Sequence, residues 1–146
     1  MSLLVTGACG FIGNRIVRTL LQQGKTDLIL VDARSYLHTR DCAKGMDGLP
    51  FIDRAELFDR LPGLAGVDAV LHLGACTDTG QTDEVYMEKW NTGYTKKLWQ
   101  WCAEKKIPLV YASSAATYGR GEQGYSDAHA LIAGLQPLNL YGRSKH

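Results

Sequence analysis

The sequence predicts an α/β protein built on a doubly wound parallel sheet, and three observations support this prediction. Apolar segments of strand length alternate along the 146 residues with segments of helical periodicity, which is the pattern of strands joined by crossover helices. The strand candidates are apolar on both faces, as expected for parallel strands covered by helices on each side. A glycine-rich turn joins the first strand to the first helix. A chain of this length is expected to form one domain.

The N-terminal part predicts two strands around one long helix. The runs "SLLVT" at 2–6 and "DLILVD" at 27–32 are the strands. Between them, residues 11–24 place apolar side chains at helical spacing. Gly24 is expected to follow the end of that helix as its C-terminal cap.

The rest of the chain continues the alternation. The predicted elements are, in order, a loop at 33–50, a short strand at 50–53, a short helix at 54–61, a strand at 67–75, a long helix at 83–106, a strand at 107–114, a loop at 119–137 and a helix that begins near Leu138. Right-handed crossovers between these strands give a doubly wound sheet.

Composition and charge argue against several classes of function. The net charge is +1, so no strong field of one sign attracts nucleic acid or a membrane surface. No apolar run approaches the ~20 residues of a membrane-spanning helix, and the N-terminus lacks the basic region of a signal peptide. We therefore expect a cytoplasmic protein. The four cysteines are widely spaced and the four histidines are scattered, which predicts reduced thiols and no metal site.

The glycine-rich turn is the strongest local motif. In "VTGACGFIG", Gly7, Gly10 and Gly13 lie between the first strand and the first helix. The first glycine permits a tight turn, the second lets the backbone approach a pyrophosphate, and the third lets helix and strand pack closely. The helix N-terminus then offers free N–H groups and a positive dipole end to phosphates. The motif in this context predicts an NAD(P)-binding Rossmann domain.

A carboxylate ends the second predicted strand. Asp32 stands 19 residues after Gly13, where a carboxylate can bind ribose hydroxyls and so favours NAD. Arg34 follows two residues later and can offset that preference by binding a 2′-phosphate. A strand-end cap at Asp32 and a solvated loop residue at Arg34 are the alternative interpretations.

Three further side chains suggest proton chemistry. The run "YASSAATYG" follows the fifth strand, so Ser113 or Ser114 is expected at the ligand-binding edge of the sheet. Tyr141 and Lys145 lie four residues apart on the last helix and therefore share a face. A lysine ammonium favours the phenolate of a nearby tyrosine, which can then act as a base near neutral pH. Such a pair alone is common; its combination with the glycine turn and the serines is informative.

These motifs resemble those of a known family. "TGACGFIG", "YASSAATYG" and "YGRSK" are similar to the extended short-chain dehydrogenase/reductase superfamily. "HLGACTDT" and the block from Tyr86 to Gly119 resemble its ADP-L-glycero-D-manno-heptose 6-epimerase family. The resemblance implies a nucleotide-sugar epimerase of lipopolysaccharide core synthesis. Such an enzyme oxidises C6 of the heptose transiently with bound NADP or NAD, and NADP is favoured.

The resemblance also implies roles for individual residues. Ser114, Tyr141 and Lys145 correspond to the catalytic group, with Lys145 also holding the nicotinamide ribose. The cofactor-binding positions are the three glycines of the turn together with Phe11, Ile12, Asp32, Ala33, Leu73, Gly74, Ala75, Cys76, Thr77 and Asn91. An ADP-sugar is the implied substrate. Leu73 departs from the pattern, because this epimerase often has an acidic residue there.

The family pattern continues for well over a hundred residues beyond the Tyr-x-x-x-Lys motif. We therefore expect residues 1–146 to be the cofactor-binding part of a chain truncated after that motif, without the C-terminal substrate domain and its second acid/base residue. The helix that carries Tyr141 and Lys145 is then short, and the pair is expected to be poorly positioned.

Other interpretations stay open at this point. The chain can be a non-catalytic NAD(P)-binding module, or another nucleotide-sugar epimerase of the same superfamily. Alternatively, it neither binds nor catalyses. A dehydratase is disfavoured because "SSAAT" offers no acidic pair. In the family a helix pair near Trp90, Trp99 and Trp101 forms the dimer interface, so a homo-oligomer is one expectation and core packing of these tryptophans is the other.

Overall fold

A computed structural model describes residues 1–39, 42, 45–46 and 48–146. The chain forms two compact units, which are described separately below. The first comprises Met1–Gly74 and Lys97–Tyr111, and the second comprises Ala75–Lys96 and Ala112–His146. Helix α5 (Gly93–Lys105) contributes its first turn to the second unit and its remainder to the first.

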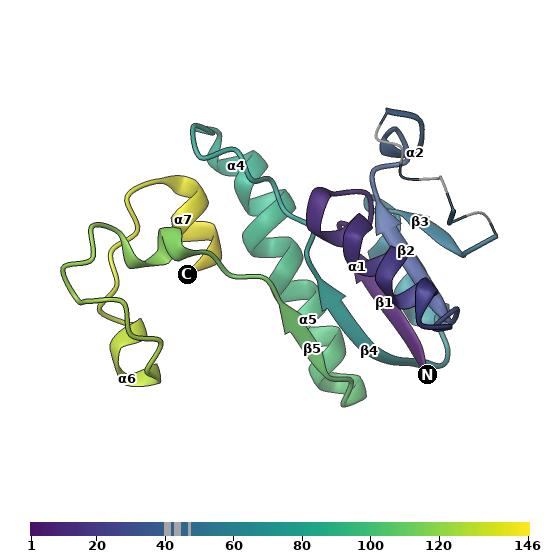
Figure 1. Ribbon diagram of the computed structural model, residues 1–146. Helices are drawn as coiled ribbons and strands as arrows, with labels where there is room; N and C mark the ends of the chain where they lie inside the picture. The colour runs from purple at the N-terminus through teal and green to yellow at the C-terminus, as the bar shows by residue number, and fades with distance from the viewer. Residues whose placement is uncertain (40–41, 43–44, 47) are drawn as a thin grey trace. The chain divides into compact units, whose positions relative to one another are not determined.

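The first unit is built on a parallel five-stranded sheet (Figure 1). Its strands are β1 (Ser2–Thr6), β2 (Leu28–Asp32), β3 (Phe51–Asp53), β4 (Val67–His72) and β5 (Leu109–Tyr111). They lie in the order β3-β2-β1-β4-β5, and every pairing is parallel. From β1 the chain adds β2 and then β3 on one side of the sheet. It then returns to the centre, where β4 pairs with the other side of β1 and β5 follows outside β4. This is the doubly wound topology predicted from the sequence, and ligands of such sheets bind where the strand order reverses.

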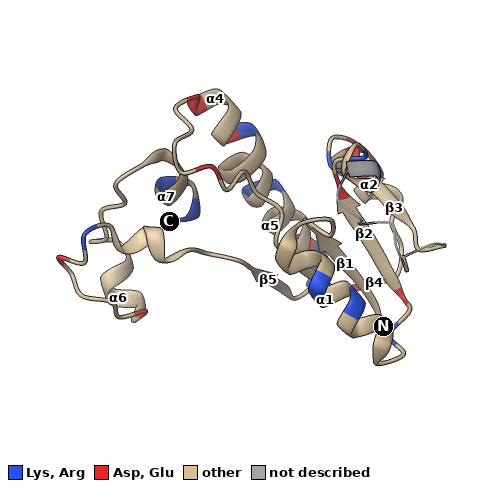
Figure 2. Cartoon of the chain, turned by 45° about the horizontal axis from the view of Figure 1, so that its top comes forward, with Lys and Arg blue, Asp and Glu red and all other residues tan. Residues whose placement is uncertain are grey.

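Apolar side chains on both faces of the central strands form the core. Every residue of β2 is buried, and Leu4 and Val5 of β1 are fully excluded from solvent. Helix α1 (Phe11–Gln22) packs here through Val17, which is also fully buried. The helix ends as predicted, because Gly24 has a left-handed φ of +75° and its N–H donates to the Leu21 carbonyl at 2.9 Å. Figure 2 shows basic positions on α1 in blue and no acidic position on this helix.

The second unit consists of short helices and loops. Its elements are α4 (Glu84–Met87), a π-helical turn (Glu88–Thr92), a 3₁₀ turn (Ala115–Tyr118), α6 (His129–Ile132) and α7 (Leu140–Lys145). Asp83 caps α4 by accepting a hydrogen bond from the Tyr86 N–H at 2.9 Å. The ring of Tyr118, at the end of the 3₁₀ turn, meets the ring of Tyr125 in the following loop edge to face at 5.6 Å.

The structure differs from the sequence prediction in three places. The predicted loop at 33–50 contains a short helix, α2 (Tyr36–Thr39), and the loop at 119–137 contains α6. Residues 40, 41, 43, 44 and 47 of the first loop lie outside the described residues. The helix predicted at 83–106 is interrupted by the π-helical turn, where the Gly93 N–H bonds to the Glu88 carbonyl five residues earlier. A side chain at Gly93 would collide with Glu88, so the glycine accommodates the wider turn.

Candidate functional site

The glycine turn lies at the carboxyl end of β1, in the first unit. Gly7 has a φ of +69°, and a Cβ at this position would lie 2.6 Å from the backbone nitrogen of Gly74, in the loop after β4. The turn and that loop therefore pass against each other, and only a glycine fits. A Cβ on Gly13 would overlap the carbonyl of Gly7. Gly13 thus allows α1 to approach the turn, which is the packing role that the sequence predicts for it.

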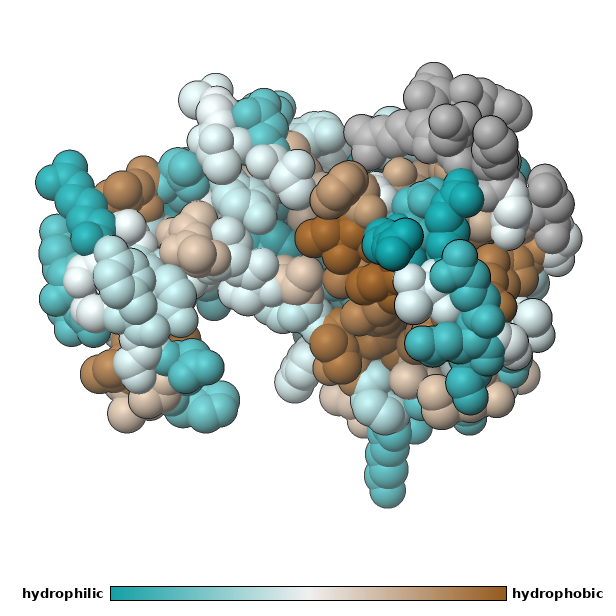
Figure 3. All heavy atoms as spheres, viewed as in Figure 1, coloured by the Kyte–Doolittle hydropathy of each residue, from teal (hydrophilic) through white to brown (hydrophobic). Residues whose placement is uncertain are grey.

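The N-terminus of α1 is open at this point. Gly10 is its N-cap; among the described residues no side chain caps the helix, and its first turn holds no acidic residue. The first amides of a helix have no partner within the helix. Phe11 and Ile12 are 96% and 59% exposed, and Figure 3 shows apolar atoms on this side of the first unit. These free N–H groups fit a bound anion.

A cavity of about 510 Å³ adjoins the same turn. It is lined by Cys9, Gly10, Phe11, Asn14, Arg15 and Arg18. The two arginines are the basic positions of α1 that Figure 2 shows in blue. The open end of the helix is therefore bordered by positive side chains.

Asp32 joins the end of β2 to the glycine turn. Its carboxylate accepts hydrogen bonds from the backbone N–H groups of Cys9 and Ala33, each at 2.8 Å, and the residue is 7% exposed. The capping role weighed as an alternative is therefore present. Each carboxylate oxygen has a second acceptor site, so capping is compatible with binding a ribose hydroxyl.

Arg34 is held on the neighbouring strand end. Its backbone N–H donates to the carboxylate of Asp53 at 2.8 Å, and its guanidinium carbon lies 5.8 Å from the centre of the Phe51 ring. Hydrogen bonds from the Ala55 and Arg34 amides hold the pKa of Asp53 below its usual value. Arg34 is itself exposed, so its side chain meets solvent as well as the Phe51 ring.

A buried polar link between β1 and β4 escaped the sequence analysis. The Thr6 hydroxyl lies 2.6 Å from Nδ1 of His72 and accepts a hydrogen bond from the Gly74 N–H at 3.0 Å. Both side chains are almost fully buried. The link fixes the loop that begins at Leu73 and continues through Gly74 to Thr77 in the second unit. The only available signal was a polar residue near the end of each of two apolar strands.

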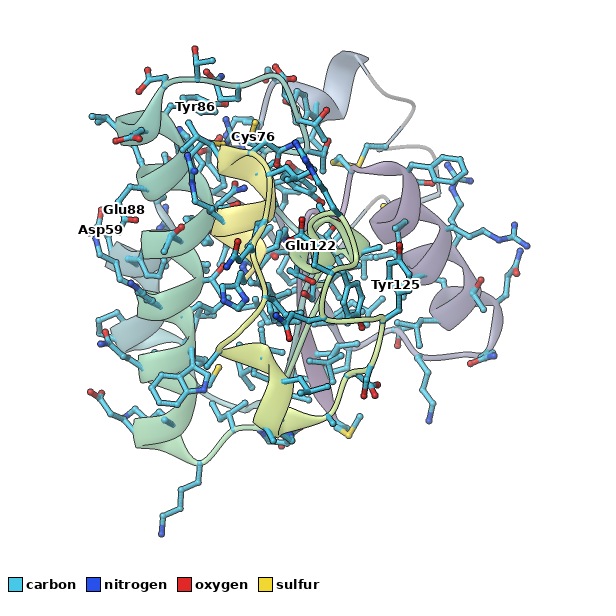
Figure 4. The ribbon with its side chains drawn as sticks, turned by 90° about the vertical axis from the view of Figure 1, so that its left-hand side faces the viewer. Asp59, Cys76, Tyr86, Glu88, Glu122 and Tyr125 are labelled. Atoms are coloured by element: carbon cyan, nitrogen blue, oxygen red, sulfur yellow. A yellow bond between two sulfur atoms is a disulfide. The ribbon has the colours of Figure 1, made fainter. Side chains whose placement is uncertain are left out.

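Asn91 organises the second unit from within the π-helical turn. Its side chain is 1% exposed; Oδ1 accepts from the Cys76 N–H at 2.7 Å, and Nδ2 donates to the Cys76 carbonyl at 3.0 Å and to Ser144 Oγ at 2.8 Å. Figure 4 labels Cys76 and Glu88, at the loop and at the start of the π turn. One amide therefore ties the loop after β4 to α7, and its acceptor and both donors are engaged within the chain.

The hydroxyls of the two adjacent serines have different hydrogen-bond partners. The Ser113 hydroxyl donates to the Lys145 carbonyl at 3.2 Å. Ser114 Oγ accepts from the Ala116 N–H at 3.1 Å and so caps the 3₁₀ turn. Because Ser114 uses an acceptor site in this bond, its hydroxyl proton is left for another partner.

Helix α7 carries Tyr141 and Lys145. It begins at Asn139, whose side chain accepts from the Gly142 N–H at 2.7 Å. Lys145 is 6% exposed, and its ammonium donates to the Ala112 carbonyl at 2.9 Å. Burial lowers the pKa of this lysine below its usual value. The expectation that the pair is poorly positioned is therefore wrong for Lys145, which is held from both ends by Ala112 and Ser113.

The cysteine prediction is wrong in part. Cys9, in the glycine turn, and Cys42 form a disulfide, while Cys76 and Cys102 are free. A sequence separation of 33 residues gives no local signal for this pairing. Across the described ranges, no helix combines the length and the apolar character needed to span a membrane.

The parallel sheet, the order of its strands and the glycine turn define a Rossmann-like α/β protein. A family model described as the NAD dependent epimerase/dehydratase family matches residues 3–146. The chain belongs to this family.

The relatives include nucleotide-sugar epimerases. Two proteins named ADP-L-glycero-D-manno-heptose-6-epimerase, from Fusobacterium nucleatum and Alkalilimnicola ehrlichii, are each 40% identical over 98% of this chain. The match covers 45% and 44% of them, so the chain spans about half the length of these curated relatives.

Solved structures agree with this result. The epimerase of the same name from Helicobacter pylori is 26% identical with a TM-score of 0.75, over 99% of this chain and 47% of that one. MoeE5 in complex with UDP-glucuronic acid and NAD is 29% identical with a TM-score of 0.76, over 99% and 46%.

Proposed function

We propose that the protein is a nucleotide-sugar epimerase that inverts C6 of an ADP-heptose by transient, NADP-dependent oxidation. The observation that carries this proposal is the 40% identity to two ADP-heptose epimerases, which extends over almost the whole of this chain. We further propose that it acts in the cytoplasm on precursors of the lipopolysaccharide core, and that a homo-oligomer is its working state.

The first unit is proposed to hold the adenosine diphosphate part of the cofactor. The open N-terminus of α1, where Phe11 and Ile12 are exposed, suits a pyrophosphate because free N–H groups and the helix dipole both favour an anion. Asp32 and Ala33 are assigned to the adenosine ribose. The backbone from Leu73 to Thr77 is assigned to the rest of the cofactor, with Asn91 acting through its two hydrogen bonds to Cys76.

The second unit is proposed to supply the proton chemistry. A dinucleotide held by the chain would supply reversible hydride transfer at the sugar carbon, as inversion of that carbon requires. Tyr141 acts as the base that removes the proton of the C6 hydroxyl. Ser114 donates a hydrogen bond from its own hydroxyl to the same oxygen. Lys145 presents an ammonium on the same helix, stabilises the phenolate and binds the nicotinamide ribose. Its buried hydrogen bond to Ala112 supports a fixed position for that charge.

The choice between NADP and NAD is proposed to depend on Arg34. Asp32 alone disfavours a 2′-phosphate, whereas a guanidinium can bind one. Titration with NADPH and NADH, followed by cofactor fluorescence, tests this. We expect the protein to bind NADPH more tightly than NADH. Arg34→Ala is expected to weaken the binding of NADPH but not that of NADH. Equal loss for both cofactors would contradict the assignment.

Turnover is the direct test of the whole proposal. The protein is incubated with the ADP-heptose substrate, and NMR follows the appearance of the C6 epimer. We expect Tyr141→Phe to abolish turnover while cofactor binding persists. Cofactor binding without turnover by the wild-type protein would favour a non-catalytic dinucleotide-binding module.

A second nucleotide-sugar substrate is the alternative that the comparisons support. MoeE5 is described with UDP-glucuronic acid and with UDP-glucose, and its structure resembles this chain as closely as that of the heptose epimerase. The same NMR assay with UDP-glucose and UDP-glucuronic acid separates the candidates. Epimerisation of a UDP-sugar, with the ADP-heptose unchanged, would overturn the heptose assignment.

A further inference from the structure

The disulfide between Cys9 and Cys42 connects two segments of the first unit that both adjoin the proposed adenosine site. Cys9 lies inside the glycine turn, between Gly7 and Gly10, and Cys42 lies in the connection between β2 and β3. Their Cα atoms are 5.0 Å apart, which is within the usual range for a disulfide. The two residues are 3% and 0% exposed, so solvent does not reach the bond in this conformation.

Cys9 also anchors the glycine turn through its backbone. Its N–H donates to Asp32 at 2.8 Å, and the other carboxylate oxygen of Asp32 accepts from Ala33. The covalent bond is therefore attached to the residue that joins the turn to the end of β2. A constraint on Cys9 is transmitted directly to the groups proposed to meet the pyrophosphate and the ribose.

Without the Cys9–Cys42 disulfide, apolar packing is what remains to hold Cys42 at the glycine turn. Cys42 and Met46 pack with Cys9, Ala8 and Val17 in one buried cluster. Two free thiols in these positions would keep that packing as small hydrophobes. They would lose the cross-link over 33 residues of sequence, and with it the covalent restraint that holds Cys42 at Cys9.

The geometry points to a redox switch: the Cys9–Cys42 disulfide organises the dinucleotide site, and its reduction weakens cofactor binding. This inference rests on the proposed function, because the dinucleotide is the ligand. Disulfides of cytosolic proteins are usually transient or redox-sensing, so a bond at a ligand-binding turn is suited to regulation. The oxidised form is the binding-competent one, since the cross-link fixes Cys42 to the glycine turn that carries Cys9.

The chemistry is a thiol–disulfide exchange with a low-molecular-weight disulfide, RSSR. The thiolate of one cysteine attacks RSSR and releases one RSH, which gives a mixed disulfide. The thiolate of the other cysteine then displaces the second RSH. Overall, two protein thiols are oxidised to one disulfide while RSSR is reduced to two RSH molecules. Because both cysteines are buried, the exchange requires a sulfur to become accessible to the reagent and is slow.

The expected effect follows from the fraction of molecules in which the site is organised. The apparent Kd equals the intrinsic Kd divided by that fraction. If the site is organised in about one tenth of the reduced molecules, the Kd for NADPH rises about tenfold. The matched control is Cys102→Ala, which removes a buried free thiol of the same unit and leaves the pair intact.

The experiment titrates NADPH into the full chain after treatment with oxidised or with reduced glutathione. Alkylation of the denatured protein and mass spectrometry count the thiols, with two expected in the oxidised form, from Cys76 and Cys102. We expect reduction to raise the Kd in the wild type and in Cys102→Ala. Cys42→Ala is expected to bind like the reduced wild type under both treatments. Cys42→Ser gives a second test if the alanine variant is unstable.

Several results would overturn the switch. They are equal Kd values for the oxidised and reduced wild type, tighter binding by the reduced form, full alkylation after oxidised glutathione, and a redox response that persists in Cys42→Ala. Binding that does not depend on redox state contradicts the switch alone. Failure of both the oxidised and the reduced form to bind either NADPH or NADH contradicts both the switch and the proposed cofactor function.

Discussion

Asn91 is expected to be the most sensitive buried polar residue of the second unit. Asn91→Ala removes three hydrogen bonds, to the N–H and carbonyl of Cys76 and to Ser144 Oγ. Since the side chain is 1% exposed, water does not replace these partners unless the structure opens. At about 1 kcal/mol for each bond, the free energy of unfolding should fall by about 3 kcal/mol.

Urea unfolding followed by circular dichroism measures this change. Asn14→Ala is the matched control. Within the described part of the chain, the Asn14 side chain bonds to Arg18 of the same helix, so its loss should change stability by no more than about 0.5 kcal/mol. Trp90 lies in the same π-helical turn as Asn91, so its fluorescence is a second probe of the unit.

A double-mutant cycle isolates the bond between the π turn and α7. Ser144→Ala removes the Asn91 bond and a local bond to the Tyr141 carbonyl, which should cost about 2 kcal/mol. The double variant should be about 1 kcal/mol more stable than the sum of the single effects predicts, because the shared bond is lost only once. Additive losses, or a loss below about 0.5 kcal/mol in Asn91→Ala, would refute the anchoring role.

Three further predictions test the surroundings of the site. Gly13→Val should lower the free energy of unfolding by at least about 1–3 kcal/mol, because the side chain would overlap the Gly7 carbonyl. Gly63→Ala is the control and should be neutral in the same urea titration, because a Cβ at Gly63 meets no atom within 4 Å. Burial lowers the pKa of Lys145 below its ordinary value of 10.5. At pH values between the lowered pKa and 10.5, the unfolded chain therefore binds more protons than the folded chain, and the free energy of unfolding should rise as the pH rises through this range. Lys145→Met should remove that rise, and an identical pH dependence in both proteins would contradict it. Burial raises the pKa of the Cys102 thiol, so iodoacetamide should label Cys76 of the native protein faster than Cys102. Peptide mass spectrometry measures the two rates, and faster labelling of Cys102 would contradict its burial.

The order of strands and helices was predictable because hydrophobic patterning determines it. The apolar strand at 28–32, the helix after the glycine turn and the cap at Gly24 all follow from short-range rules of spacing and backbone freedom. The π-helical turn was not predictable in this way, since apolar periodicity continues on both sides of it. The glycine at position 93 was the one available signal, and it also suits an ordinary helix.

The interactions that shape the candidate site depend on distant residues. The pairing of Cys9 with Cys42 and of Thr6 with His72 joins segments that are 33 and 66 residues apart. Local sequence rules describe neither separation. Asp32 shows how this affects interpretation. Its place at a strand end predicted a carboxylate directed at a ligand, whereas the fold adds two backbone amides that already occupy one acceptor site on each oxygen.

The two serines after β5 provide the sharpest test of the catalytic assignment. The structure gives them separate partners, with Ser113 bonded to the end of α7 and Ser114 bonded to the Ala116 amide. If Ser114 donates to the reacting oxygen, Ser114→Ala should lower kcat for ADP-heptose epimerisation by about 10²-fold or more. Ser113→Ala should act only through the position of Lys145 and lower kcat much less.

Ser114→Thr distinguishes catalysis from capping, because threonine keeps a hydroxyl that can fill both roles. It should restore part of the activity lost in the alanine variant, and thermal melts of all three variants control for unfolding of the 3₁₀ turn. A larger loss of kcat in Ser113→Ala than in Ser114→Ala, at equal stability, would transfer the proton-donating role to Ser113. The carbonyl of Lys145 would then have to give up its bond to that serine during catalysis.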